Sequence, residues 1–328
     1  MPRNGSGVAS KPPGTTAVPN TTVESAKYNS TIDDIYALLN DPLPITAGGT
    51  GAISIEAMRS DFSLVAYVAQ TLTAAQQAQV RNNVSAALKG HIYGLTLSNS
   101  VSDPVNDIDI AAGEAASTET NPVLMILASS LTKRLDAAWA VGTGNGGLDT
   151  GSIGNNTYHI WLIQRSDTGV VDALFSLSAT APTMPANYDR KRRIGSIIRS
   201  GGTILGFTQN GDTFILNVGI NNRSSTAAQA STLLALTVPT GVVVQPILLS
   251  TQAQNAVGNI QTQFANAGGA LGTYVTTVAN QEIGNVYISG GIFTNTSAQI
   301  QFGVSIIGGS LFSNDLITRG WIDPRGRT

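Results

Sequence analysis

Two neighbouring runs of sequence decide the fold class: Thr157-Tyr-His-Ile-Trp-Leu-Ile-Gln-Arg165 and Gly169-Val-Val-Asp-Ala-Leu-Phe-Ser-Leu177. Both are rich in β-branched and aromatic residues, which favour extended backbone. Because side chains alternate between the two faces of a strand, Tyr158, Ile160 and Leu162 would share one face of the first run, and the residues between them the other. The two runs therefore predict two β-strands.

Runs of the same kind recur through the rest of the chain, separated by Gly, Asn, Asp and Pro. Many short strands with frequent turns indicate a mainly β fold of the β-sandwich or jelly-roll-like type. We find no fixed-period repeat, which disfavours a solenoid or a propeller. The predicted strands lie at 91–97, 106–110, 122–128, 157–165, 169–177, 193–199, 213–220, 232–238, 241–249, 272–279, 284–293, 298–307 and 311–317.

The region before residue 91 has a different pattern. Residues 1–23 are rich in Pro, Gly, Thr and Asn with no apolar period, so we expect them to be extended or flexible on their own. The next residues predict a short helix that ends near Asn40, since a proline follows at position 42. Its apolar face needs a partner, which could be the same helix in a sister chain. That face consists of Tyr28, Ile32, Ile35, Tyr36 and Leu39.

Two further helices are expected, over 54–69 and from Thr73 onward, after a glycine-rich turn at 46–51. The sequence thus predicts four segments along the chain. They are an N-terminal segment with a short helix (1–50), a helical neck (51–90), a β domain (91–215) and a C-terminal β-sandwich domain (216–328).

Composition narrows the class of function. Charged residues make up 12% of the chain, against roughly 25% in soluble globular proteins, and the net charge is −2. Nucleic acid is therefore not expected as a partner, because phosphate binding needs an excess of Lys and Arg. The absence of cysteine excludes disulfides and thiolate metal sites. No run approaches the ~20 apolar residues of a membrane helix, and the first residues lack the apolar core of a signal peptide.

Candidate catalytic residues are few. The chain has two histidines, and each is more simply explained as structural than as a metal ligand or a base. Paired carboxylates could hydrolyse polysaccharide, but several of the candidate Asp residues lie among turn residues, where the Asp side chain commonly accepts hydrogen bonds from the backbone. We therefore expect no enzymatic activity and no cofactor. The residues considered are His91, His159, Asp103, Asp107, Asp109, Asp136, Asp149 and Asp172.

Two sets of residues are candidates for binding. The run Arg190-Lys-Arg-Arg193 is the one dense positive patch, and it could meet acidic groups on a cell-surface glycan, acids of a neighbouring subunit, or simply deter unwanted strand pairing. Residues 316–328, which carry Trp321 beside several arginines, are expected to dock against a β domain of the same chain or of a neighbouring one, with a receptor-contacting tip as the alternative. Trp321 is therefore a candidate for an oligomer interface together with Tyr28, Ile32, Ile35 and Leu39. By contrast, Gly142–Gly147 lacks the Lys-Ser/Thr of a phosphate loop and is expected to be a flexible turn.

The N-terminal third resembles bacteriophage tail fibre proteins. The opening Met1-Pro-Arg-Asn-Gly-Ser-Gly7 and the stretch Asn29-Ser-Thr-Ile-Asp-Asp-Ile35 are similar to the start of such proteins. Leu43-Pro-Ile-Thr-Ala-Gly-Gly-Thr-Gly-Ala52 resembles their "P-x-x-x-G-G-T-G-A" hinge. Leu72-Thr-Ala-Ala-Gln-Gln77 and Arg81-Asn-Asn-Val84 look like the helix and the "R-x-N-L/I" signature that follow. The earlier Arg59-Ser-Asp-Phe62 departs from that signature.

A second resemblance, to a β domain of predicted tail and fibre proteins, spans residues 91–215. It is carried by Gly146–Gly151, Tyr158–Ile163, Thr168–Asp172 and Tyr188–Gly195. Beyond residue 215 only the C-terminal Gly320-Trp-Ile-Asp323 is similar to the family.

The resemblance implies an elongated homotrimer in the virion, attached to the phage tail or baseplate through its N-terminal segment and involved in host adsorption. The partners are then other copies of the chain, tail proteins and, as a candidate, a host glycan, without membrane insertion. A collar, decoration or adaptor protein with no receptor contact is the alternative, and a polysaccharide depolymerase is a further one.

Overall fold

The computed structural model describes residues 22, 24–40, 73, 89–120, 122–254, 259–277, 282–288, 290–308 and 311–327. The chain divides into two compact units, Met1–Ala74 and Ala75–Thr328. One helix and twenty strands are found in the described residues, so the prediction of a mainly β fold is confirmed. The predicted turn at 46–51 and the helix at 54–69 lie outside the described residues, as does the third helix apart from Thr73.

Helix α1, Ser25–Asn40, is the described element of the first unit. It contains no Gly or Pro, and Asp41-Pro42 follows its last residue, which ends the helix where the sequence predicts. Its large apolar side chains are open to solvent in the single chain: Tyr28 is 60% exposed, Ile35 46% and Tyr36 62%. The helix therefore presents an uncovered apolar stripe.

The second unit begins with what we call the first β part, strands β1 to β11. An eight-stranded sheet has the order β11-β10-β8-β9-β7-β6-β3-β2, and a three-stranded sheet the order β1-β4-β5. The bounds are β1 Ile92–Gly94, β2 Leu97–Asn99, β3 Asp107–Ile110, β4 Gly113–Ala116, β5 Leu124–Leu127, β6 Leu131–Ala138, β7 Asn145–Leu148, β8 Thr157–Gln164, β9 Val171–Ser176, β10 Arg190–Ser200 and β11 Thr203–Ile204.

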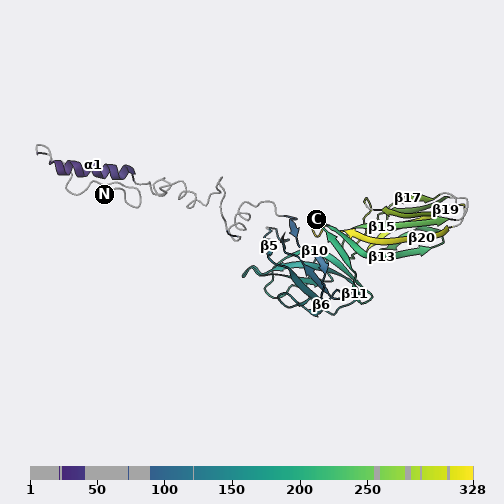
Figure 1. The fold of residues 1–328 in the computed structure, drawn as a ribbon. Helices are drawn as coiled ribbons and strands as arrows, with labels where there is room; N and C mark the ends of the chain where they lie inside the picture. Colours follow the sequence, from purple (N-terminus) through teal and green to yellow (C-terminus); the bar gives the residue numbers. More distant parts are fainter. Residues whose placement is uncertain are drawn as a thin grey trace. The chain divides into compact units, whose positions relative to one another are not determined.

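The second β part, strands β12 to β20, is a two-layered sandwich (Figure 1). A five-stranded sheet has the order β12-β13-β20-β15-β18 and a four-stranded sheet the order β14-β19-β16-β17, all antiparallel. The bounds are β12 Phe207–Asn210, β13 Thr213–Ser225, β14 Gln229–Ala235, β15 Gln245–Gln254, β16 Asn259–Ala265, β17 Gly272–Thr277, β18 Glu282–Ile288, β19 Gln299–Ile307 and β20 Leu311–Ile322.

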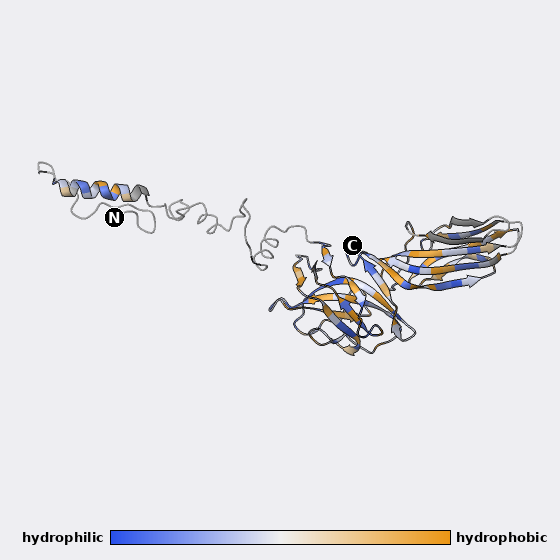
Figure 2. Cartoon of the chain, in the orientation of Figure 1, coloured by the Kyte–Doolittle hydropathy of each residue, from blue (hydrophilic) through white to orange (hydrophobic). Residues whose placement is uncertain are grey.

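Apolar and polar residues alternate along many of the strands, as Figure 2 shows, and burial follows this alternation. On β19, Ile300, Phe302 and Val304 are buried while Gln299 and Gln301 lie on the opposite face. One cluster of buried apolar residues runs through both β parts, from Leu97 and Ile160 in the first to Phe214 and Trp321 in the second. The two parts therefore share a core.

Six strands were not predicted from the sequence: β4, β6, β7, β11, β12 and β16. Three of them show why. β6 carries a buried lysine on its inner face, β7 contains two glycines, and β16 is mostly polar, so none shows the usual apolar alternation. β7 also corrects the expectation of a flexible turn over Gly142–Gly147, since Asn145–Leu148 pairs in parallel with β6 and β9. The predicted domain boundary at 215/216 falls inside β13, and the change of sheets comes earlier, between β11 and β12.

A fully buried ion pair joins β6 and β9, the two strands on either side of β7. Lys133 on β6 lies 3.2 Å, Nζ to Oδ1, from Asp172 on β9, and both side chains are almost without exposure. The lysine also donates a hydrogen bond of 2.6 Å to the carbonyl of Ala140. A Cβ on Gly147 of β7 would lie 2.7 Å from the Phe175 ring and 3.1 Å from the Cβ of Lys133, so only glycine fits at this crossing. Burial lowers the pKa of Lys133, and the Asp172 carboxylate opposes that shift.

Replacing Asp172 should unfold the first β part readily, because the Asp172→Ala variant leaves the Lys133 ammonium buried without its counter-ion. We expect a loss of about 3–5 kcal/mol in the free energy of unfolding, measured by urea denaturation. Asp136→Ala removes a carboxylate that pairs with Arg134 at the surface and should cost about 1 kcal/mol or less. Equal losses in the two variants would contradict the buried-pair interpretation.

Candidate functional site

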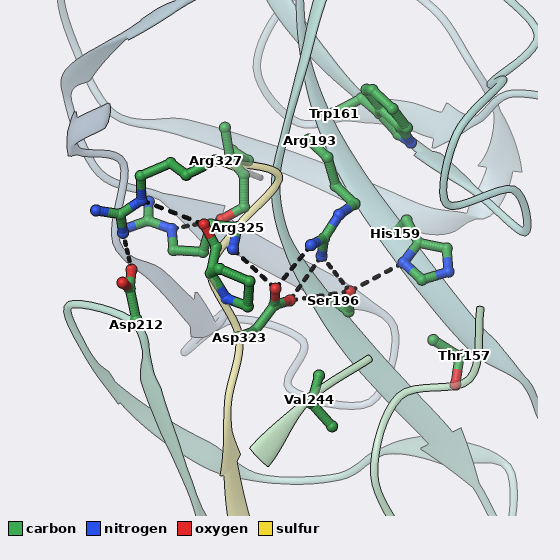
Figure 3. Close-up of polar contacts among 12 residues, drawn as sticks. Thr157, His159, Trp161, Arg193, Ser196, Asp212, Val244, Asp323, Arg325 and Arg327 are labelled. Carbon is green, nitrogen blue, oxygen red and sulfur yellow. Dashed lines mark hydrogen bonds and ion pairs between the residues drawn. The ribbon is translucent and has the colours of Figure 1, made fainter. Parts of the chain in front are cut away.

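Several charged side chains meet where residues Asp323–Arg327, which we call the terminal segment, follow β20 and lie against the first β part (Figure 3). Asp323 is fully buried and accepts two hydrogen bonds from the Arg193 guanidinium, of 2.6 Å from Nη1 and 2.7 Å from Nη2. Paired hydrogen bonds of this kind fix both the distance and the orientation of the two groups. The pair joins β10 to a residue 130 positions later in the chain.

The arginines of the terminal segment extend this contact. Arg325, 4% exposed, donates from Nε to the carbonyl of Ile194 at 2.8 Å and from Nη2 to the carbonyl of Leu95 at 3.2 Å. Its backbone has a φ of +57°, and its amide donates to Oδ1 of Asp323 at 2.8 Å. That hydrogen bond holds a non-glycine residue in a left-handed conformation that is otherwise uncommon. At the segment's end, Arg327 pairs with Asp212.

A histidine and a serine complete the cluster. Nδ1 of His159 on β8 lies 2.9 Å from Oγ of Ser196 on β10, and the Arg193 guanidinium also donates to Oγ at 2.9 Å. The neighbourhood of Asp, Ser and His suggests a hydrolytic triad, but Ser196 is fully buried and the Asp323 charge is neutralised by Arg193. A nucleophile needs access to substrate and a base that orients toward it. The geometry instead suits a structural contact.

Burial sets the protonation of this cluster. It lowers the pKa of His159 to about 4, and the nearby Arg193 charge acts in the same direction, so the imidazole is neutral at pH 7. Burial alone would raise the pKa of Asp323, but the hydrogen bonds and the charge of Arg193 outweigh it, so the pKa is lowered. At neutral pH the cluster therefore holds one buried ion pair beside a neutral histidine.

A cavity of about 750 Å³ lies beside the terminal segment. Trp161 and Arg193 of the first β part line it, and so do Val243, Phe293 and Pro324 of the second. Phe293 and Val243 are about half exposed, at 46% and 49%. The volume falls within the ~300–1,000 Å³ typical of small-molecule sites. Its charged lining residues, Arg193 and Asp212, already pair with Asp323 and Arg327, so the walls offer apolar and neutral polar groups.

The structure separates the predicted basic patch into two pairs. Arg192 and Arg193 are 4% and 5% exposed and both contact the terminal segment, Arg192 by donating to the carbonyl of Gly326. Arg190 and Lys191 are partly exposed, and Arg190 donates to Gln164. The four residues thus do not form one exposed patch, because β10 turns the last two toward the chain's own terminal segment.

Of the two docking sites predicted for Trp321, its own chain or a neighbouring one, the structure shows the first: the side chain is buried within the chain at 1% exposure and not at an oligomer interface. Its ring stacks on Phe214 with centroids 5.4 Å apart and planes within 8° of parallel. This packing leaves no surface on the indole for a second copy. Of the other predicted interface residues, Tyr28 and Ile35 are exposed and Ile32 is half-buried on α1, while Leu39 belongs to the same helix.

Four of the candidate acids lie near one another: burial raises the pKa of Asp107, and the charges of Asp103, Asp136 and Asp109 act in the same direction. Asp103 accepts from the amide of Val105 at 3.0 Å in a turn, as expected for Asp at such a position.

The other candidates lie elsewhere in the fold. His91 lies 2.8 Å from Glu114, far along the chain from His159. Within the described ranges, no three His, Asp or Glu side chains converge as a metal site would need. Nor is any helix there long and apolar enough to cross a membrane.

Sequence reasoning missed the Arg193–Asp323 pair, since the two residues are too far apart for spacing to connect them. The available signal was an arginine placed directly before the apolar strand Ile194–Ile198 in a chain with few charges.

No protein-family model matches this chain, and no curated protein matches it either.

Removing the carboxylate of Asp323 should release the terminal segment. The Asp323→Ala variant leaves Arg193 buried and unpaired, which we expect to cost about 3–5 kcal/mol of unfolding free energy. Limited trypsin digestion should then cleave after Arg325 faster than in the wild type. The control is Asp315→Ala, a carboxylate on β20 that accepts from Ser224 at the surface. If both variants resist trypsin as the wild type does, the pair does not hold the segment.

His159 should make the unfolding free energy depend on pH. The unfolded histidine binds a proton below about pH 6.5, whereas the folded one, with its pKa near 4, does not until much lower pH. The unfolded state therefore takes up more protons between these values, and stability falls by roughly 3 kcal/mol as the pH drops from 6.5 to 4.

A His159→Gln variant tests this dependence. It lacks the titrating group, so its stability should fall less steeply than that of the wild type over the same range. Urea unfolding at pH 7, 5.5 and 4.5 measures both slopes. Parallel slopes would show that His159 does not contribute.

Proposed function

We propose that the chain is a structural, non-enzymatic component of a bacteriophage tail: a homotrimeric fibre attached through its N-terminal segment and involved in host adsorption. The observation that carries the proposal is the uncovered apolar stripe of α1, with Tyr28, Ile35 and Tyr36 about half exposed or more in the single chain. The tail-fibre motifs that surround this helix in the sequence support the same role.

The spacing of the stripe favours association between copies. Tyr28, Ile32, Ile35 and Leu39 are four, three and four residues apart, as in the seam of a coiled coil. Isoleucine at both seam positions, here Ile32 and Ile35, favours three or four strands over two. A helix of 16 residues with several Ser, Thr and Asn is marginal alone in water, so burying its stripe in a bundle would stabilise it.

The second unit supports a structural role rather than catalysis. The histidine, serine and acid that lie closest to a catalytic arrangement are buried and serve the contact with the terminal segment. The buried Lys133–Asp172 pair is likewise bonded internally.

The bundle predicts that the oligomer depends on the stripe. An Ile32→Asp/Ile35→Asp variant places two charges per chain in the seam, at a cost on the order of 3 kcal/mol per charge. Light scattering after size-exclusion chromatography should give a trimer for the wild type and smaller species for the variant at equal concentration. The control Ser30→Asp/Ala37→Asp adds the same charge on the opposite side of the helix and should stay trimeric. A monomeric wild type would overturn the proposal.

Position and role in the particle are tested on virions. Antibody against this chain should label the tail in electron micrographs, and particles that lack the second unit should assemble but adsorb poorly. Particles that fail to assemble would identify a collar or adaptor protein instead. Release of soluble sugar from host polysaccharide by the purified chain would identify a depolymerase.

A further inference from the structure

Charge is distributed very unevenly within the second unit. From residue 224 to residue 314 the sequence holds a single charged residue, Glu282, in 91 positions. The preceding stretch, residues 91–223, has 20 charged residues in 133 positions. Soluble surfaces normally carry many charges, whereas the central parts of protein interfaces are depleted of them. The contrast within one compact unit points to the second β part as the place where surface is covered.

The four-stranded sheet β14-β19-β16-β17 presents the uncharged surface. The buried Ile300, Phe302 and Thr262 fix which side chains point inward, so their sequence neighbours point outward. In the register of the sheet, Leu233 lies opposite Gln301, Ala235 opposite Gln299, and Gln261 opposite Ser305. We call these six residues the amide face. Leu233, on the outer strand of this face, is 46% exposed and lies beside Gln301, a large apolar side chain next to an amide.

Strand β14 forms an open edge of this sheet. Among the described strands it pairs with β19 on one side only, and most of its residues are exposed. Soluble proteins usually protect such an edge with charged residues or proline, because an unpaired strand invites contact with another chain. The sequence of β14, Gln-Ala-Ser-Thr-Leu-Leu-Ala, contains neither. Strand β14 and the amide face thus both lack charged residues, as surfaces that another chain covers do.

We infer that the amide face packs against a second copy of this chain, an inference that rests on the homotrimer proposed above and assigns one of its contact surfaces. The absence of charge indicates which kind of molecule covers the amide face. In a symmetric assembly every copy offers the same surface, so charges near the axis would face their own kind, and an uncharged face avoids that repulsion. A charged partner such as nucleic acid or an acidic protein would instead require complementary charges, which the amide face lacks.

The test places a photo-reactive group on the face. The chain has no cysteine, so a Leu233→Cys variant can be labelled at one position with benzophenone maleimide. Illumination of the purified, full-length protein should produce covalent adducts of two and three chains, resolved on denaturing gels. The matched control is Val170→Cys, 42% exposed in the first β part, which should yield at least tenfold less adduct.

Oligomeric mass separates the two proposals. Light scattering of both labelled variants and of the wild type reports whether the assembly is intact, and circular dichroism reports folding. Adducts at position 233 and not at 170, in a trimer, establish the contact. A trimer without adducts at 233, or with equal adducts at both positions, overturns the inference and leaves the fibre proposal standing. A folded monomer in all three overturns both.

A milder variant addresses the same face without a probe. Leu233→Lys suits an exposed edge strand and should leave the chain folded. It should raise deuterium uptake across β14 at least tenfold in rate relative to Val170→Lys, because its charge would be buried without a partner against the neighbouring copy's uncharged surface and would weaken the contact. Unchanged uptake would count against the contact.

Discussion

The ion pair between Arg193 and Asp323 is the constraint on which the arrangement of the second unit depends. Both groups are nearly without solvent, so neither can stay there without the other. Asp323 directly follows β20, and β20 lies between β13 and β15 in the five-stranded sheet. Fixing Asp323 on β10 therefore also fixes the end of the strand that organises the second β part, and it brings Trp321 against Phe214 in the shared core.

The same pair explains how a low-charge chain places its few charges. In the first β part, Lys133, Arg192 and Arg193 are turned inward and bonded to carboxylates or carbonyls. The second β part has five charged residues, and only Glu282 lies between residues 224 and 314. Charged side chains therefore fix how segments pack inside the unit. The exposed surface of the four-stranded sheet, by contrast, carries amide, hydroxyl and apolar side chains. That division fits the proposed contact between copies through the second β part.

Sequence patterns predicted the parts of the fold that follow local rules. α1 was found from its apolar spacing and the proline that follows, and β8, β9 and β19 from their alternation. β6 was missed because an inward-facing lysine breaks the alternation, and its partner on β9 cannot be identified from spacing. The site was missed for the same reason: Arg193 was read as a surface charge because nothing local reveals a carboxylate 130 residues away.

A buried ion pair is weak support for stability, since apolar residues of similar size often do as well or better. Its value lies in specificity: only one position of the terminal segment brings a carboxylate onto both guanidinium nitrogens of Arg193. Arg325 reinforces that choice, because its left-handed backbone and its bonds to the carbonyls of Ile194 and Leu95 exist only in this docked position. An elongated assembly of identical chains needs each unit to adopt one shape, since a segment docked in two ways would change the surface offered to the next copy. The cluster therefore serves the proposed fibre by removing alternatives rather than by adding strength.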